Sequence, residues 1–559
     1  VNVWPDNPIG YGAEGMKYRF QWNFPIFFSP HDTNKIYACS QYLHVSYNGG
    51  EKWEIISPDL SRNDSAKLVS SGGPITKDNT GVEYYSTIFA AAESPLEKGL
   101  LWCGSDDGLL HVSKDGGKNW KNVTPKKLPE WSQINSIEVD PFQKGGLYMA
   151  VTRYKHGDYK PYLYYTKNYG ETWELIINGI PEEHFTRVIR ADRTVKGLLY
   201  CGTEYGIYIS SDNGQHWQPF QLNLPTVPIT DLALKDNDLI IATQGRSFWI
   251  LDDLNVIWDE LSNPTKETEL RLFKVSPTVV FGGGNGSKSV IAGTNHPAGV
   301  RFFFNIPNIK NSVLLRFIDS NGKIIRTFDS KAPETVNQLT IEKGLNIFNW
   351  NGRYEKADAF EGLLMWWGTL DGPVAPPGQY KARLICENDS VEINFEILMD
   401  PRTEGTLEDI QAQFEFLLDI RNKVDETHDA IRHMRAVKNQ IAALNMRLDS
   451  VQHAIVIAEG KRLDSLMTEI ESVLYQTKLK SNQDMLNYPI KLNNKLAHIA
   501  SLASMGSYRP THQMIAVKDN ITQQINQELQ KWQAIQNRDL PAYNALIREE
   551  KVNVIGVKE

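Results

Sequence analysis

The sequence predicts a mainly β protein with a helical C-terminal part, and three observations support that fold class. An eight-residue pattern recurs four times within the first 260 residues. Short alternating apolar runs separated by turn residues fill residues 269–400, and from Thr406 onward apolar residues recur every three or four positions. We therefore expect three successive parts, over residues 1–260, 269–400 and 406–550: a partial β-propeller, a β-sandwich and a helical hairpin or bundle.

The eight-residue pattern, Ser/Thr-x-Asp/Asn-x-Gly-x-x-Trp, is termed the box turn. Its copies are Ser46–Trp53, Ser113–Trp120, Thr166–Trp173 and Ser210–Trp217, roughly 45 to 65 residues apart, which is the length of a four-stranded propeller blade with variable loops. The Asp or Asn side chain caps its own backbone and Gly supplies a positive φ, while Trp packs where the next strand begins. A fifth repeat starts at Ile229 but has Gly245–Asp253 in place of the box, so we expect about five blades.

This pattern resembles the Asp-box (BNR) repeat of sialidases, of family 74 glycoside hydrolases and of the sortilin/VPS10 receptors. The resemblance implies that the box turn is structural. It also implies a larger propeller, because propellers with this repeat usually close with more blades. We expect the remaining blades to precede Val1; the alternatives are a small five-bladed ring or a partner chain that completes the ring.

Blade topology predicts where a site lies. If the four strands A to D of each blade alternate in direction, the D–A and B–C connections share one face, the box turns decorate the other, and strand A lines the central channel. The candidate catalytic residues on the shared face are Glu83, Asp106, Asp107 and Glu204. The candidate ligand-binding residues there are Tyr84, Tyr85, Arg153, Arg187, Arg190, Tyr205 and Arg246.

These residue types suit two chemistries. A glycoside hydrolase needs two carboxyl groups, about 5–5.5 Å apart for retention or 6.5–9.5 Å for inversion, and Tyr84, Tyr85 or Trp131 would stack on a sugar. A sialidase needs an arginine triad and a Tyr/Glu pair, but its Arg-Ile-Pro motif is absent. The structural alternative is that the charges cap turns, since Asp106-Asp107-Gly108 also reads as a plain hairpin turn.

No cofactor or metal site is expected. Cys39, Cys103 and Cys201 occupy the same place in three of the repeats, so they are interpreted as buried strand residues rather than as ligands or reactive thiols. The histidines of the helical part, His428 and His453 among them, lie at irregular steps. The balance of 59 Lys+Arg against 67 Asp+Glu gives a net charge of -8, which argues against a nucleic-acid partner. No apolar run reaches the roughly 20 residues that span a bilayer, so no transmembrane segment is expected.

The two C-terminal parts carry weaker motifs. Phe348–Arg353 and Pro376–Tyr380 resemble the immunoglobulin-like domain of flagellar hook-capping proteins. Trp366 and Trp367 are expected to pack beneath a loop rather than to bind sugar. The helical stripe is expected to run from Ile410 to Ile455, with an interruption or bend at Gly460, and a second stripe to follow over residues 515–535.

The order of the three parts resembles large secreted proteins of the Bacteroidetes type that are labelled sortilin-like or glycosyl-hydrolase-like. The resemblance implies a secreted or cell-envelope location. Our first hypothesis is a binding or scaffold protein whose propeller mouth holds a peptide or glycan. The alternative is a glycoside hydrolase of the family 74 or sialidase-like kind, with a carboxylate pair at that mouth.

Overall fold

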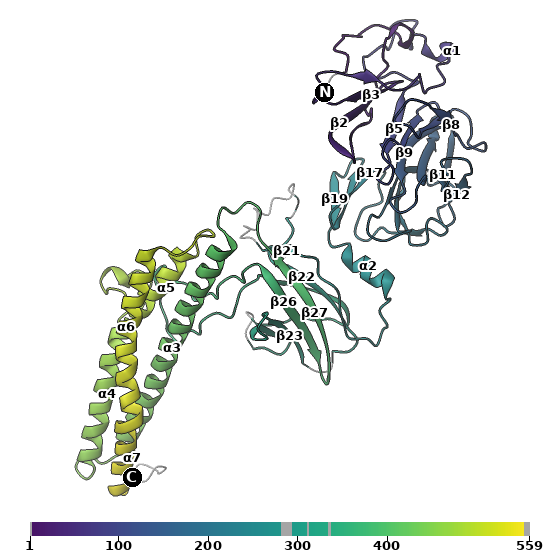
Figure 1. The fold of residues 1–559 in the computed structure, drawn as a ribbon. Coiled ribbons are helices and arrows are strands. Elements are labelled where there is room, and N and C mark those ends of the chain that lie inside the picture. Colours follow the sequence, from purple (N-terminus) through teal and green to yellow (C-terminus); the bar gives the residue numbers. More distant parts are fainter. Residues whose placement is uncertain (1–2, 281–292, 294, 310–311, 334–336, 553–559) are drawn as a thin grey trace. The chain divides into compact units, whose positions relative to one another are not determined.

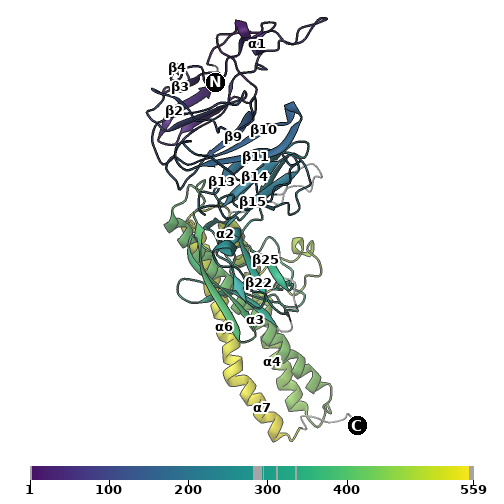
Figure 2. The same ribbon diagram turned by 90° about the vertical axis from the view of Figure 1, so that its right-hand side faces the viewer.

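The computed structural model describes residues 3–280, 293, 295–309, 312–333 and 337–552. The chain forms two compact units, Val1–Ser262 and Asn263–Glu559, which are taken separately below (Figures 1 and 2). The first unit is built from β-sheets with only short helices. The second combines two sheets with a set of long helices, so the protein is mainly β with a helical C-terminal part, as predicted.

The first unit contains five antiparallel sheets that follow one another along the chain, and in each the strands pair in sequence order. The first four sheets have four strands each: β1(Ile26–Ser29) to β4(Glu54–Ile55) with β2(Asp32–Cys39) and β3(Leu43–Ser46); β5(Ile88–Glu93), β6(Leu101–Ser105), β7(Leu110–Ser113) and β8(Lys121–Asn122); β9(Gln133–Val139), β10(Leu147–Arg153), β11(Asp158–Thr166) and β12(Glu174–Leu175); β13(Thr186–Ala191), β14(Leu199–Thr203), β15(Gly206–Ser210) and β16(Gln218–Pro219). The fifth has β17(Ile229–Lys235), β18(Asp238–Thr243) and β19(Phe248–Leu251). Short helices are η1(Ala13–Gly15), α1(Ser65–Leu68), η2(Tyr154–His156) and α2(Asn255–Ser262).

Neighbouring sheets pack through their first strands. β9 contacts both β5 and β13, and β13 contacts β17. Residues of β1, β5, β9, β13 and β17 together line one groove. This is the arrangement of propeller blades with the first strand innermost, as the topology argument predicted.

Each box turn is closed by its own side chains. In the second copy the Ser113 hydroxyl accepts from the backbone N–H of Gly117 at 2.9 Å, and Asp115 Oδ1 accepts from the N–H of Asn119 at 2.9 Å. The same two bonds recur in the other three copies at 2.9–3.0 Å. The acidic or amide side chain of the box is therefore occupied by the turn itself.

The box tryptophans connect successive blades. The indole N–H groups of Trp120, Trp173 and Trp217 donate to the carbonyl oxygens of Ile56, Val123 and Ile176, at 2.9, 2.9 and 2.8 Å. Each acceptor lies three residues after the box tryptophan of the preceding blade. Trp53 belongs to the first blade, and its buried indole N–H has no hydrogen-bond partner within the described residues.

The cysteines of the repeats are buried strand residues, which confirms the prediction. Cys39, Cys103 and Cys201 lie on β2, β6 and β14, are at most 1 % exposed and form no disulfide within the described residues. Burial raises the pKa of each thiol well above its ordinary value. These thiols are therefore held protonated and unreactive.

In the part of the second unit that the structure describes, two packed sheets come first. One has the order β20(Arg271–Leu272), β22(Val300–Ile306), β25(Gly344–Trp350), and the other the order β21(Thr278–Val279), β27(Asp389–Leu398), β26(Gly378–Cys386), β23(Val313–Ile318), β24(Ile324–Asp329). Aromatic side chains fill the space between them: Trp350 is fully buried and stacks on Phe317, with ring centroids 4.3 Å apart. This is a β-sandwich core.

Helices follow as a bundle rather than a simple hairpin: α3(Leu407–Asn445), α4(Ala454–Leu474), η3(Asp484–Leu486), α5(Leu492–Ala503), α6(His512–Ala534), a π-helical turn at Ile535–Asp539 and α7(Leu540–Glu549). In both ribbon views α3, α4 and α6 run alongside one another (Figures 1 and 2). Within the described residues no helix is long and apolar enough to cross a membrane.

Two expectations about the helical stripe were wrong. Helix α3 ends at Asn445, and Val451 and Ile455 are exposed rather than part of a continuous buried stripe. Gly460 lies inside α4 and does not interrupt it, while a bend at this position stays a prediction. A Cβ atom there would meet Tyr543 Oη at 2.6 Å and Ile441 Cγ2 at 2.9 Å, so the glycine permits close helix packing instead of breaking the helix.

Residues 355–371, the middle part of the long connection between β25 and β26, contact the helices. Phe360 is buried in the helical core, and Arg421 donates to the carbonyl oxygens of Glu355 and Lys356 at 2.9 and 2.7 Å. The boundary that the sequence predicted between residues 400 and 406 stays a prediction, because sandwich and helices form one compact unit.

Candidate functional site

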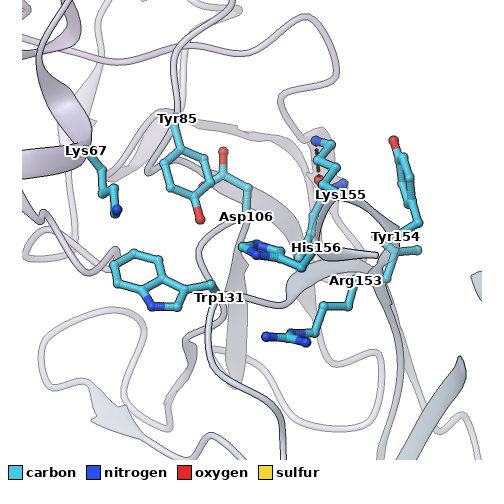
Figure 3. A pocket seen from close by; sticks show the side chains of 10 residues that line it. Lys67, Tyr85, Asp106, Trp131, Arg153, Tyr154, Lys155 and His156 are labelled. Carbon is cyan, nitrogen blue, oxygen red and sulfur yellow. Dashed lines mark hydrogen bonds between the residues drawn. The ribbon is translucent and has the colours of Figure 1, made fainter. Parts of the chain in front are cut away.

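A pocket of about 320 Å³ opens where the D–A and B–C connections of the second and third blades meet (Figure 3). Its lining residues are Lys67, Tyr85, Asp106, Trp131, Gln133, Thr152, Arg153, Tyr154, Lys155 and His156. We call it the mouth pocket. It brings together three of the predicted site residues, Tyr85, Asp106 and Arg153, and it confirms that these connections share a face.

Asp106 is the one carboxyl group among the ten described residues that line the mouth pocket. It lies in the tight turn between β6 and β7 and is 5 % exposed. Its Oδ1 accepts from the backbone N–H of Thr87 at 2.9 Å, and its Oδ2 accepts from the Thr87 hydroxyl at 3.1 Å. Burial, together with the neighbouring Asp107 carboxylate, outweighs these bonds and raises the pKa of Asp106 to about 7. The carboxyl is therefore present in both protonation states near neutral pH.

Aromatic side chains face Asp106 in the mouth pocket. Figure 3 shows Tyr85 and Trp131 on either side of the cavity, with His156 between them and Arg153. Burial, with the two aspartates close by, raises the pKa of the Tyr85 phenol well above its usual range. Trp131 has φ of +62°, a conformation that a bulky residue rarely adopts, and the Arg62 guanidinium lies 4.7 Å from its ring centroid.

The rest of the lining is basic. Arg153 donates from Nε to the Glu130 carbonyl oxygen at 3.2 Å and lies 3.4 Å from Asp158 Oδ2. Lys155 Nζ donates to Gln133 Oε1 at 3.0 Å, and its charge favours the ionised form of Asp106. With Lys67 and His156, the pocket holds four basic side chains against one carboxyl group.

The central groove, about 770 Å³, continues from the mouth pocket and shares Gln133, Tyr154 and Lys155 with it. Predicted residues Arg187 and Arg190 line the groove. Arg190 is held by the Leu232 carbonyl oxygen at 2.7 Å and by Asp231 at 2.7 Å. Its guanidinium thereby links the fourth and fifth blades.

Two of the predicted carboxylates are occupied by the fold. Asp107 is fully buried and accepts from the Arg62 backbone N–H at 2.8 Å and from the hydroxyls of Ser86 and Ser105, at 2.5 Å each. Glu204 forms an ion pair with Arg187, at 2.6 Å. Asp107 thus ties the turn between β6 and β7 to the preceding connection.

The remaining predicted residues lie outside the mouth pocket lining. Glu83 is exposed and accepts from Trp22 Nε1 at 2.8 Å and from Thr80 at 2.7 Å. Tyr84 is buried and donates to the carbonyl oxygens of Pro8 and Tyr11. Tyr205 stacks on His184 with centroids 4.7 Å apart, and Arg246 is exposed and contacts its neighbour's carbonyl oxygen.

Sequence reasoning missed Lys67, Lys155 and His156. Lys155 and His156 follow Arg153 and Tyr154 directly in the turn after β10, so the position of Arg153 was a signal that they would share its surroundings. Lys67 gave no such signal, because it lies on α1 within an insertion of irregular length. Within the described part of the chain, no group of three or more His, Cys, Asp or Glu side chains is placed to hold a metal ion.

Comparisons with known proteins give partial similarities. No protein-family model matches the chain. The oligoxyloglucan-reducing end-specific xyloglucanase of Emericella nidulans is 31 % identical over 87 residues, which are 15 % of this chain and 10 % of that protein. The chain thus spans about a tenth of the curated relative that it matches.

Among solved structures, the GH74 xyloglucanase from Xanthomonas campestris is 15 % identical, with a TM-score of 0.31 over 41 % of this chain and 36 % of that one. YCF48 from Cyanidioschyzon merolae is 12 % identical, with a TM-score of 0.29 over 40 % of this chain and 66 % of that one. An ancestral GH74 enzyme is 16 % identical, with a TM-score of 0.29 over 59 % of this chain and 40 % of that one.

Proposed function

We propose that the first unit is a ligand-binding module that takes a peptide or glycan into the mouth pocket and along the central groove, in a secreted or cell-envelope scaffold protein of the sortilin-like type. The observation that carries the proposal is the composition of the mouth pocket, where Tyr85 and Trp131 face Arg153 and Lys155 around a single buried carboxyl group. An aromatic wall gives contact area, and a few fixed polar groups give orientation.

The bonding state of the other candidates supports binding over catalysis. Glycoside hydrolysis by acid and base or nucleophile needs a second carboxyl group facing the first across the substrate. The Asp107 carboxylate already accepts three hydrogen bonds within the fold, and the Glu204 carboxylate already forms an ion pair with Arg187. Arg153 contacts the Glu130 carbonyl oxygen and Asp158, Lys155 contacts Gln133, and both side chains keep further N–H donors for a ligand.

A glycoside hydrolase of the family 74 or sialidase-like kind is the second candidate, favoured by Asp106. A buried carboxyl whose pKa lies near 7 suits a general acid at neutral pH. The 87-residue similarity to a xyloglucanase supports the same reading. In that case Glu83, Asp107 or Glu204 would supply the partner carboxylate after rearrangement on substrate binding.

The test is a binding screen of the full chain against immobilised oligosaccharides and peptides. Arg153→Ala and Trp131→Ala are expected to weaken capture at least tenfold, and Lys118→Ala, an exposed lysine in the second box turn, is the matched control. Asp106→Asn keeps an oxygen for Thr87 and is expected to alter affinity without abolishing it. Turnover of a glycan that Asp106→Asn abolishes would replace the binding proposal with the hydrolase. Capture unaffected by Arg153→Ala and Trp131→Ala would remove the mouth pocket from the function.

We also propose that a further blade, from an N-terminal extension of the same polypeptide, packs against the first blade. Trp53 carries the argument: its three counterparts each donate to a carbonyl oxygen of the preceding blade, whereas its own buried N–H has no acceptor within the described residues. A preceding blade would supply that acceptor three residues after its own box position.

The test of this proposal is a longer polypeptide that includes whatever is encoded upstream. Trp53→Phe is expected to destabilise the longer polypeptide and to leave the 559-residue chain almost unchanged. If Trp53→Phe is neutral in both, no blade occupies this face from the N-terminal side. A partner protein that restores the Trp53 effect in trans would assign the blade to a separate chain instead.

A further inference from the structure

The second unit presents an open aromatic surface formed by two consecutive tryptophans. Trp366 and Trp367 stack with ring centroids 5.5 Å apart and an interplanar angle of 27°. Trp366 is half-buried, but Trp367 is 72 % exposed. The expectation that both tryptophans pack beneath the loop therefore holds only for the first. A large indole left in solvent forgoes the burial that usually stabilises it.

Trp367 is held in its exposed position by fixed contacts. Its φ is +53°, a left-handed conformation that costs energy for a bulky residue. The neighbouring backbone is clamped to α5: buried Asn494 accepts from the Trp366 N–H at 2.7 Å and donates to the Trp366 carbonyl oxygen at 2.8 Å. His498 Nδ1 lies 3.2 Å from the Trp367 carbonyl oxygen. The ring is thus presented by a rigid, strained segment rather than by a flexible loop tip.

The rings of Trp366 and Trp367 are not covered by Lys or Arg side chains, whereas those of Trp4 and Trp131 are. Lys17 lies 3.5 Å from the Trp4 ring centroid, and Arg62 lies 4.7 Å from that of Trp131. Among the described residues, no Lys or Arg side chain lies over the ring of Trp366 or Trp367. No described group accepts a hydrogen bond from the Trp367 indole N–H. The surface therefore offers a flat π face and one free donor.

We propose that Trp366 and Trp367 form a carbohydrate-binding platform, separate from the mouth pocket, for a neutral glycan with equatorial substituents. The C–H groups on one face of such a pyranose ring are weakly positive and match the negative face of an indole, while the sugar hydroxyls accept from the indole N–H. Because Trp366 stacks against Trp367 and is half-buried, the sugar is expected to bind on the exposed part of the Trp367 ring, which Trp366 supports from behind. The rigid clamp lowers the entropy lost on binding.

The proposal is tested by titrating the full chain with cellohexaose by calorimetry, and by its retardation in native gels that contain hydroxyethyl cellulose. Trp367→Ala is expected to weaken binding at least tenfold, whereas Trp367→Phe retains most of it because the phenyl ring still stacks. Tyr508→Ala removes another exposed aromatic side chain of the same unit and is the matched control. Thermal unfolding of each variant verifies that the second unit is intact.

A variant of the mouth pocket distinguishes binding in the first unit from binding at Trp366 and Trp367. If Arg153→Ala abolishes cellohexaose binding and Trp367→Ala does not, the sugar binds in the first unit and the platform proposal fails. Equal binding by Trp367→Ala and the unaltered chain overturns it as well, as does the absence of binding and retardation with these glucans. If Trp367→Ala instead abolishes self-association measured by light scattering, the surface is a contact for a second copy of the chain, and the carbohydrate assignment is wrong.

Discussion

The two units are held together over very different distances along the chain. In the first, the bonds that define each box turn join residues four apart, and the blade-to-blade bonds of Trp120, Trp173 and Trp217 reach only to the previous repeat. In the second, the connection between β25 and β26 is fixed by Asn494 and Tyr475, which lie 128 and 111 residues away from their partners.

This difference predicts how far the destabilising effect of a substitution extends through each unit. In a repeat array each unit contacts its neighbours only, so a local change is expected to stay local. In the second unit the sandwich connection supplies core residues such as Phe360 to the helical bundle, so damage to either layer reaches the other. The predictions below test that contrast, from the largest expected effect to the smallest.

Truncating the sandwich core should have the largest effect. Trp350→Ala removes a fully buried indole stacked on Phe317 and should lower the free energy of unfolding by about 3–5 kcal/mol. Chemical denaturation followed by far-ultraviolet circular dichroism should show the helical signal lost together with the sandwich. Loss of the sandwich with helices retained would contradict the coupling of the sandwich to the helices through the connection that carries Phe360.

Replacing the Asp106 carboxyl by an uncharged amide should stabilise the first unit. The pKa of Asp106 is raised to about 7 from an ordinary value near 4, so the folded state loses stability as the pH rises from about 4 through about 7. Asp106→Asn should therefore raise the free energy of unfolding at pH 8 by up to about 4 kcal/mol, and the gain should vanish near pH 4.

Asp107→Asn is the control for that measurement, made by denaturant titration at the two pH values. Asp107 accepts from the Arg62 N–H and from two hydroxyls, so its amide variant is expected to be destabilised. Stabilisation by both substitutions would mean that crowding of two carboxylates, rather than the burial of Asp106, controls the pH dependence.

The long-range clamp should be worth more than a box turn. Asn494→Ala removes a buried side chain and leaves the part-buried backbone N–H and carbonyl of Trp366 without this partner, which should cost about 2 kcal/mol. Asp115→Ala in the second box turn removes exposed local bonds and should cost about 1 kcal/mol or less. The two losses are compared by differential scanning calorimetry, and a larger loss for Asp115→Ala would reverse the contrast between the units.

The smallest effect distinguishes one box tryptophan from the next. Trp120→Phe and Trp173→Phe each remove a bond to the preceding blade and should cost about 1 kcal/mol beyond the loss of ring volume. Trp53→Phe removes an N–H that has no hydrogen-bond partner among the described residues, so its extra cost should be near zero in the 559-residue chain. Equal losses at Trp53 and Trp120 in denaturant melts would show that the bond to the preceding blade contributes little.

Much of the first unit was predictable because its determinants are local. The Ser/Thr, Asp/Asn and Gly of each box turn make their bonds within five residues, so their pattern survives in any single copy. Strand alternation then placed Asp106 and Arg153 on one face. Sequence reasoning did not separate Asp106 from Asp107, because their difference lies in which side chain meets Ser86 and Ser105 in space.

The ends of the helices were harder to predict from the sequence, because they depend on contacts with residues far along the chain. The periodicity near Ile455 and the glycine at position 460 have the same sequence signature whether a helix turns back or continues. What decided the outcome was the neighbour: Tyr543 and Ile441 pack against Gly460 and need its missing side chain.

The sequence by itself determined the blade repeat, the sandwich and the helical class, because short-range turn chemistry and hydrophobic period specify elements. Only the tertiary structure decided that Asp106 faces a basic pocket, that Trp53 lacks the acceptor its counterparts have, and that Trp367 stands exposed above α5. Those facts depend on which distant groups share or leave empty the space around a side chain, and no local pattern records that.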